Sequence, residues 1–146
     1  MIDYIPILTT ILSLYFFIEI FKHYLSRKKK YLLWWMIGVA TFGLGTLCES
    51  LHTIIGYNEF NLRFWYIIGA MLGGFPLAQG TVYLLFSKKF ANRTSLFFIS
   101  YILIAAIFIL IVPVTITENF DGSLTGQVFE WKWVRLFSIP INIYAV

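Results

Sequence analysis

Charged residues are scarce in this chain, making up 12% of its 146 residues. A typical soluble domain carries about twice that share, roughly 25%. Hydrophobic residues account for 60% and aromatic residues for 20%. So few charges cannot give a 146-residue globule a polar surface. The composition therefore excludes an ordinary soluble domain and requires a surface that faces something other than water.

Cysteine occurs once, as Cys48, so an intrachain disulfide and a cysteine-rich zinc site are both excluded. Gly-rich phosphate loops, low-complexity tracts, nucleophile elbows and aspartyl pairs are also lacking. The sequence therefore predicts no catalytic residue, no metal site and no cofactor. An intramembrane enzyme is the least supported class of function.

What the chain has instead is long apolar runs, each of the length that crosses a bilayer as a helix. They predict an all-α, polytopic transmembrane helix bundle forming one domain over 1–146, with four complete spans and a shorter fifth. The expected spans are 5–25, 31–56, 62–86, 94–116 and 133–146. A longer loop over 117–132 is predicted to turn at Asp121–Ser123. The first run follows Asp3 and precedes Arg27–Lys30, the reverse of a cleaved signal peptide, so it is expected to be a retained anchor.

The loops differ strongly in basic residues. Of the eleven Lys and Arg residues, eight flank the loops after the first and third spans. The other three are Arg63, Lys132 and Arg135. Because Lys and Arg favour cytoplasmic loops, this bias predicts an N-terminus on the non-cytoplasmic side. The same distribution assigns the net charge of +4 to membrane topology and argues against nucleic acid as a partner.

The fifth run is short and unusual. Residues 133–146 would extend about 21 Å as a helix, less than the roughly 30 Å hydrocarbon core. We therefore expect the native protein to continue beyond Val146. The run contains Arg135, Pro140 and Asn142. Proline kinks a helix, and Asn142 falls about 13 Å along it, as in broken helices that line substrate cavities.

Small residues are predicted to line facing stripes of the second and third spans. At about 100° per residue, each stripe is roughly 80° wide. The second span contributes Gly38, Thr41, Gly45, Glu49, His52 and Gly56. The third contributes Trp65, Gly69, Gly73, Pro76, Gly80 and Tyr83, with Gln79 beside them. Gly69 and Gly73 have the GxxxG spacing, so we expect these stripes to pack against each other or a shared third helix.

Glu49 and His52 are spaced i and i+3 on an otherwise apolar helix, and ionisable residues in a membrane are functional candidates. Glu49 lies about 27 Å along its span, close to the outer boundary. Two interpretations stay open. Glu49 contacts interfacial water or pairs with Arg63 or Arg135, or it accepts a proton or ligand with His52 as its titrating partner.

Two other polar residues within spans have structural interpretations. Glu19 is expected to pair with Lys22 and His23 at i+3 and i+4. Gln79 is expected to hydrogen-bond Thr81 or a neighbouring helix and so to hold helices together. A Glu-x-x-His metal centre would need a second such motif, which the sequence lacks.

The stretch Phe64–Ala70, followed by Gly73–Leu85, resembles a pattern in uncharacterised bacterial and archaeal multi-pass membrane proteins. Gly45, Thr46 and Glu49 in the preceding span are similar too, so the resemblance covers about 34–85. It implies a longer protein of about seven spans in the cytoplasmic membrane of a prokaryote, and it implies no substrate. A more distant similarity is to seven-span sensor regions of histidine kinases, although no signalling domain is visible here.

These patterns predict a non-enzymatic membrane protein that senses or binds a small ligand, or that associates with other membrane subunits or itself. The alternative is a transporter or channel component with a polar pathway near Glu49, His52, Pro140 and Asn142. The candidate ligand or proton sites are Glu49, His52, Gln79, Arg135 and Asn142. The candidate helix-packing residues are Gly38, Gly45, Gly69, Gly73 and Gly80.

Overall fold

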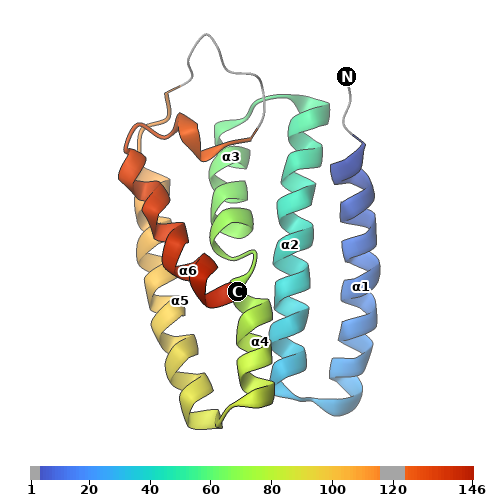
Figure 1. Cartoon of the computed structure of the whole chain (residues 1–146). Coiled ribbons are helices and arrows are strands. Elements are labelled where there is room, and N and C mark those ends of the chain that lie inside the picture. Colours follow the sequence, from blue (N-terminus) through green and yellow to red (C-terminus); the bar gives the residue numbers. More distant parts are fainter. Residues whose placement is uncertain (1–3, 116–123) are drawn as a thin grey trace.

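A computed structural model describes residues 4–115 and 124–146. The helices run alternately up and down and lie side by side as a bundle (Figure 1). The elements are α1 (Ile5–Arg27), α2 (Lys30–Ile55), α3 (Glu59–Trp65), the π-helix η1 (Tyr66–Met71), α4 (Phe75–Leu85), α5 (Lys88–Ile111), the 3₁₀ helices η2 (Gly126–Val128) and η3 (Lys132–Phe137), and α6 (Ser138–Ala145). The predicted all-α bundle is confirmed.

Four helical stretches are long and apolar enough to cross a membrane: Ile5–Arg27, Lys30–Ile55, Glu59–Leu85 and Lys88–Ile111. The fourth stretch begins earlier than the predicted 94 because the Ser87 side chain caps it, accepting a 3.3 Å hydrogen bond from the Phe90 amide. It ends before the predicted 116 because Pro113 follows, and the residue before a proline avoids helical backbone. Ile116 and the predicted turn at Asp121–Ser123 lie outside the described residues.

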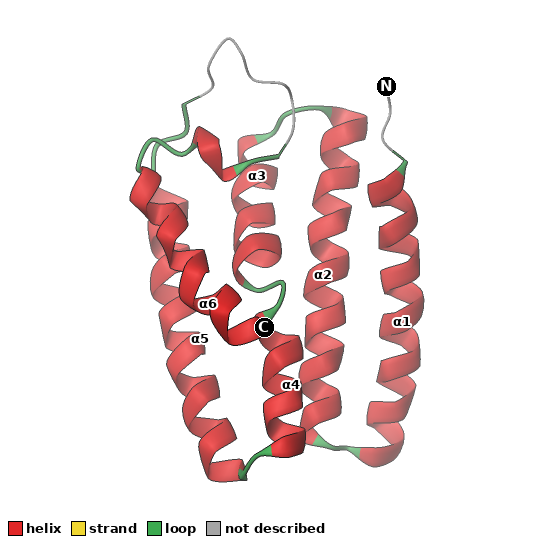
Figure 2. Cartoon of the chain, viewed as in Figure 1, coloured by secondary structure: helices red, strands yellow, loops and turns green. Residues whose placement is uncertain are grey.

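Apart from a loop at Leu72–Gly74, the described connections lie at the two ends of the bundle (Figure 2). We call one the basic end, because Lys28–Lys29 and Phe86–Ser87 join helices there beside most of the chain's basic residues. The other, the distal end, holds the turn Gly56–Asn58. The distal end also holds an antiparallel bridge between Val114 and Phe129.

The third membrane stretch is interrupted, where the sequence predicted one continuous span over 62–86. Its helix widens to a π-helix over Tyr66–Met71, breaks at Leu72–Gly74, and resumes as α4 with Pro76 in its first turn (Figure 1). A Cβ atom on Gly73 would overlap the carbonyl oxygen of Gly69. Glycine permits this backbone path, and a proline that lacks an N–H fits the start of the new helix.

The final segment, which consists of η3 and α6, runs from the distal end beside α5 and finishes next to the break in the third stretch (Figure 1). A Cβ atom on Gly74 would lie 2.7 Å from the Cβ of Ala145. The predicted kink at Pro140 is replaced by a change from 3₁₀ to α geometry at Ser138. Pro140 falls in the first turn of α6, where its missing N–H is tolerated.

The hydrophobic core lies between the third stretch, α5 and the final segment. Its most deeply buried large side chains include Leu62, Met71, Phe75, Ile109, Phe129 and Ile141. By contrast, α1 packs chiefly against α2, and Ser13 is its buried residue. Ser13 lies 3.0 Å from where a Cβ on Gly43 would be, and Thr10 donates a 3.0 Å hydrogen bond to Thr46 across the same interface. α1 is therefore a peripheral helix with a largely exposed apolar surface.

Candidate functional site

The second and third membrane stretches approach closely where glycines remove side chains. A Cβ on Gly45 would lie 3.3 Å from the Cα of Gly69. One on Gly38 would lie 2.7 Å from Cγ of Leu77. One on Gly80 would overlap the Trp35 indole and lie 3.0 Å from the Tyr31 carbonyl. Small residues at such contacts let membrane helices pack backbone to backbone.

Two of the five glycines predicted to pack helices, Gly69 and Gly73, lie closest to atoms of their own stretch. A Cβ on Gly69 would first meet the Trp65 side chain of its own stretch, 3.5 Å away. A Cβ on Gly73 would meet the Gly69 carbonyl. The GxxxG pair therefore also shapes the backbone of the third stretch itself.

Glu49 is partly buried on the face of α2 that turns toward α3. Its Oε1 accepts a 3.0 Å hydrogen bond from the indole Nε1 of Trp65. His52 lies one turn further toward the distal end and is also partly buried. The structure thus brings Glu49 and Trp65 together across the α2–α3 interface.

The arginines considered as partners of Glu49 have other positions. Arg63 forms an ion pair with Glu59 through Nη2 and Oε1 at 2.6 Å, and it donates to the Ile109 and Leu110 carbonyls. Arg135 is exposed on η3. Among the residues the structure describes, neither arginine forms an ion pair with Glu49. In the adjacent turn, partial burial and then the Glu59 carboxylate raise the pKa of Tyr57, and Arg63 opposes them.

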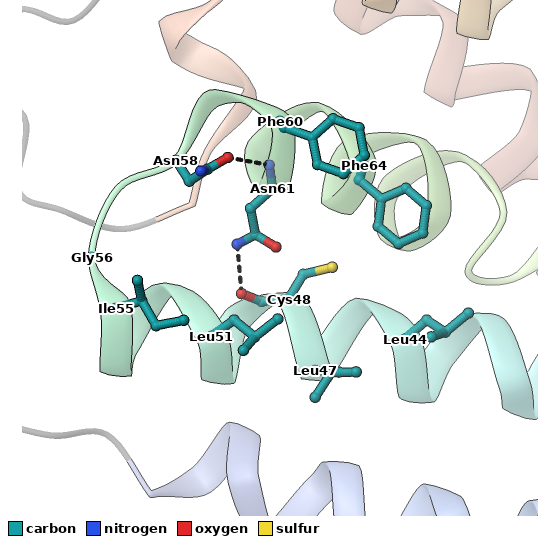
Figure 3. A pocket seen from close by; sticks show the side chains of 10 residues that line it. All are labelled: Leu44, Leu47, Cys48, Leu51, Ile55, Gly56, Asn58, Phe60, Asn61 and Phe64. Carbon is teal, nitrogen blue, oxygen red and sulfur yellow. Dashed lines mark hydrogen bonds between the residues drawn. The ribbon is translucent and has the colours of Figure 1, made fainter.

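A groove of about 310 Å³ opens beside this interface, between α2 and α3 (Figure 3). It is lined by Leu44, Leu47, Cys48, Leu51, Ile55, Gly56, Asn58, Phe60, Asn61 and Phe64. Phe60 and Phe64 stack with ring centroids 6.0 Å apart and form one wall. The leucines of α2 form the other. We call this cavity the α2–α3 groove.

The polar groups of the α2–α3 groove belong to the distal turn. Asn58 caps α3 by accepting a 3.1 Å hydrogen bond from the Asn61 amide. Asn61 in turn donates a 2.8 Å hydrogen bond from its Nδ2 to the Cys48 carbonyl, which connects the turn to α2 (Figure 3). Gly56, with φ of 92°, makes the sharp bend that the turn needs. The groove therefore has apolar walls and an amide-bearing end.

A second groove, of about 430 Å³, lies between α1 and α2. It shares Leu44 and Leu47 with the first groove, so these two leucines form a ridge between the two. Its polar members are the small hydroxyls of Thr10 and Ser13. Those hydroxyls already form hydrogen bonds within the protein. Ser13, for example, donates a 2.7 Å hydrogen bond to the Thr9 carbonyl. The amides of Asn58 and Asn61 each have a second polar atom besides the one that bonds within the protein, so the α2–α3 groove offers more polar groups to a ligand.

Gln79 is completely buried and connects three helices. Its Nε2 donates a 2.8 Å hydrogen bond to the Ala91 carbonyl of α5. Its Oε1 accepts from Tyr144 of α6 at 2.8 Å and from Thr94 of α5 at 3.3 Å. Thr81, the intrahelical partner considered above, donates instead to the Leu77 carbonyl. Gln79 therefore holds α4, α5 and α6 together.

The remaining candidates lie elsewhere. Arg135 and Asn142 are exposed on the final segment, and the structure does not bring them to Glu49 or Gln79. The expected ion pair of Glu19 with Lys22 is confirmed at 2.7 Å. Sequence reasoning missed Asn61 and Tyr144. The only signal for Asn61 was its place in a polar turn, and its contact with Cys48 depends on the fold.

Comparisons of the chain with protein-family models, with curated proteins and with solved structures gave no match. The fold and the long apolar helices are those of a helical membrane protein.

Proposed function

We propose that this membrane protein binds an amphiphilic, lipid-like molecule in the α2–α3 groove. The observation that carries the proposal is the combination of apolar walls with two asparagines at one end of a cavity of about 310 Å³. Ligand sites commonly have volumes from about 300 to 1,000 Å³ and a few polar groups that fix orientation. In this proposal the chain's role is binding or sensing within the membrane.

The asparagines decide the selectivity of such a site. Lipid tails are as apolar as leucine, so inside a bilayer the groove walls alone give little preference for any ligand. A hydrogen bond within a membrane contributes roughly 0.6 to 2 kcal/mol. At about 1.4 kcal/mol per tenfold in affinity, contact with Asn58 or Asn61 would favour a polar-headed ligand by about threefold to thirtyfold.

A transporter or channel component is less well supported. The interrupted third stretch resembles broken helices that surround transporter sites. However, the residues around that break are packed, with Phe75 almost fully buried and Ala145 against Gly74. A polar pathway would also need Glu49 and Asn142 on one route, and Glu49 faces Trp65 while Asn142 is exposed.

Photochemical crosslinking tests the binding proposal. The purified chain in phosphatidylcholine nanodiscs would be irradiated with a palmitic acid that carries a diazirine in its chain, and crosslinked residues would be mapped by mass spectrometry. We expect saturable crosslinking to residues that line the α2–α3 groove. The Leu51→Trp substitution fills the groove and should lower that yield by about tenfold.

The matched control is Leu103→Trp, the same substitution at an exposed leucine of α5 that does not line the groove. It should leave groove crosslinking unchanged. Crosslinks that rise in proportion to probe concentration on every apolar helix, and that Leu51→Trp does not reduce, would show ordinary solvation by lipid and overturn the proposal.

A further inference from the structure

The short 3₁₀ helix η3 separates its residues into three faces. A 3₁₀ helix has three residues per turn, so side chains at i and i+3 share a face. Lys132 and Arg135 therefore occupy one face, and both are exposed. Trp133 and Leu136 occupy the next, exposed by 46% and 59%. Val134 is fully buried on the third face.

Aromatic contacts fix η3 against the distal end of α5, beside which Figure 1 shows the final segment descending. Trp131 and Trp133 stack at 5.9 Å between centroids. Trp133 also meets Phe108 of α5 edge to face at 5.3 Å, and Phe108 stacks on Phe137 at 5.6 Å. The cationic face of η3 is therefore held in place.

The tryptophans beside Lys132 indicate how deep the cationic face of η3 would lie in a membrane. Indole rings with one polar group favour the boundary between lipid headgroups and hydrocarbon. Trp131 and Trp133 flank Lys132 in the chain, so a boundary position of the tryptophans would place the neighbouring cations near the lipid phosphates. Amphipathic helices with Lys or Arg on one face and Trp or Leu on another have the pattern that binds membrane surfaces.

No acid in the described part of the chain forms an ion pair with the two cations of this face. Within residues 4–115 and 124–146, the ion pairs are Glu19 with Lys22 and Glu59 with Arg63. Arg63 is thus neutralised, whereas Lys132 and Arg135 belong to neither pair. Glu130, the nearby described acid, is exposed and pairs with neither cation.

We infer that η3 binds an anionic phospholipid. The phosphate lies at Lys132 and Arg135, and an acyl chain lies along the apolar face formed by Trp133 and Leu136. Charge complementarity selects this occupant, because a zwitterionic headgroup offers no net charge to the pair. This site lies on the final segment, apart from the α2–α3 groove, and does not depend on the proposed function. Two cations near a charged lipid surface are expected to favour anionic over zwitterionic lipid by roughly thirtyfold.

The test uses the whole chain in phosphatidylcholine vesicles that contain a trace of phosphatidylglycerol bearing a diazirine near its headgroup. Crosslinks would be mapped by mass spectrometry. We expect strong crosslinking to residues 131–137 that unlabelled phosphatidylglycerol displaces and unlabelled phosphatidylcholine does not. The double substitution Lys132→Gln and Arg135→Gln should lower this crosslinking about tenfold or more.

The control is Lys88→Gln with Lys89→Gln, which removes two exposed cations at the basic end and should leave crosslinking at 131–137 unchanged. Equal displacement by both unlabelled lipids in the native chain would overturn the inference, and this readout needs no variant to fold. A folded Lys132→Gln, Arg135→Gln variant that crosslinks like the native chain would overturn it too.

Discussion

The indole of Trp65 donates a 3.0 Å hydrogen bond to the carboxyl group of Glu49, which joins the second and third membrane stretches. Of the two sequence-based interpretations of Glu49, neither included this neutral donor. The contact predicts how substitutions at Glu49 behave. A glutamine keeps a carbonyl oxygen that can accept the same hydrogen bond, whereas a leucine cannot.

We therefore expect Glu49→Gln to keep most of the native stability and Glu49→Leu to cost roughly 1 kcal/mol, as does Trp65→Phe. The measurement is denaturant unfolding in mixed micelles, followed by circular dichroism. A double-mutant cycle of Glu49→Leu with Trp65→Phe should show coupling of roughly 0.5 kcal/mol or more. Additive effects would mean that the hydrogen bond contributes nothing.

Gln79 gives a second prediction, because from a fully buried position on α4 it bonds groups of two other helices, α5 and α6. Gln79→Leu removes the acceptor of the partly buried Tyr144 hydroxyl and one donor to the Ala91 carbonyl, which Thr94 still bonds at 3.1 Å. The expected loss is about 1 to 3 kcal/mol, measured in the same unfolding assay. Thr81→Val, which removes an exposed hydroxyl bonded within its own helix, is the control. Equal stability of the two variants would contradict the role of Gln79.

The interrupted third stretch gives a third prediction. Gly73→Ala places a Cβ against the Gly69 carbonyl and should cost about 1 to 3 kcal/mol by overpacking. Gly69→Ala would bring its Cβ only within 3.5 Å of the Trp65 ring, an ordinary contact. It should therefore be tolerated far better. The measurement is the thermal unfolding midpoint of each purified variant. If Gly69→Ala lowers the midpoint as much as Gly73→Ala does, the two glycines would act only in packing between helices.

Much of this fold can be predicted from the sequence because apolar length alone defines a membrane helix. The runs near Ile5–Arg27 and Lys30–Ile55 were predicted within two residues at each end. The break at Leu72–Gly74 could not be predicted in this way, since the residues there are apolar and hydropathy stays high across them. Gly73 was interpreted as a packing residue, although it also lies in the interruption.

The candidate site was harder to predict, because its contacts join residues distant in sequence. Asn61 meets the carbonyl of Cys48 thirteen positions earlier, and Tyr144 meets Gln79 from the other end of the chain. Glu49 stood out as a charge in an apolar helix. Its actual partner, Trp65, carried no signal beyond its place on the facing stripe.

The side of the membrane on which each end lies remains a prediction from the basic residues. Single cysteines would be placed at Lys28 and Asn58 in a Cys48→Ala background and treated with a membrane-impermeant maleimide in intact cells. We expect Asn58→Cys at the distal end to be labelled at once, and Lys28→Cys at the basic end only after permeabilisation. The reverse pattern would invert the topology.

The most direct test of the account concerns the α2–α3 groove itself. A 4-fluorophenylalanine would be incorporated at Phe64, which lines the groove, or at Phe97, which is 63% exposed on α5. A nitroxide-labelled fatty acid would then be titrated into nanodiscs while the fluorine signal is recorded. The account predicts broadening that saturates at Phe64 and rises linearly at Phe97. Linear broadening of equal size at both positions would contradict a binding site between α2 and α3.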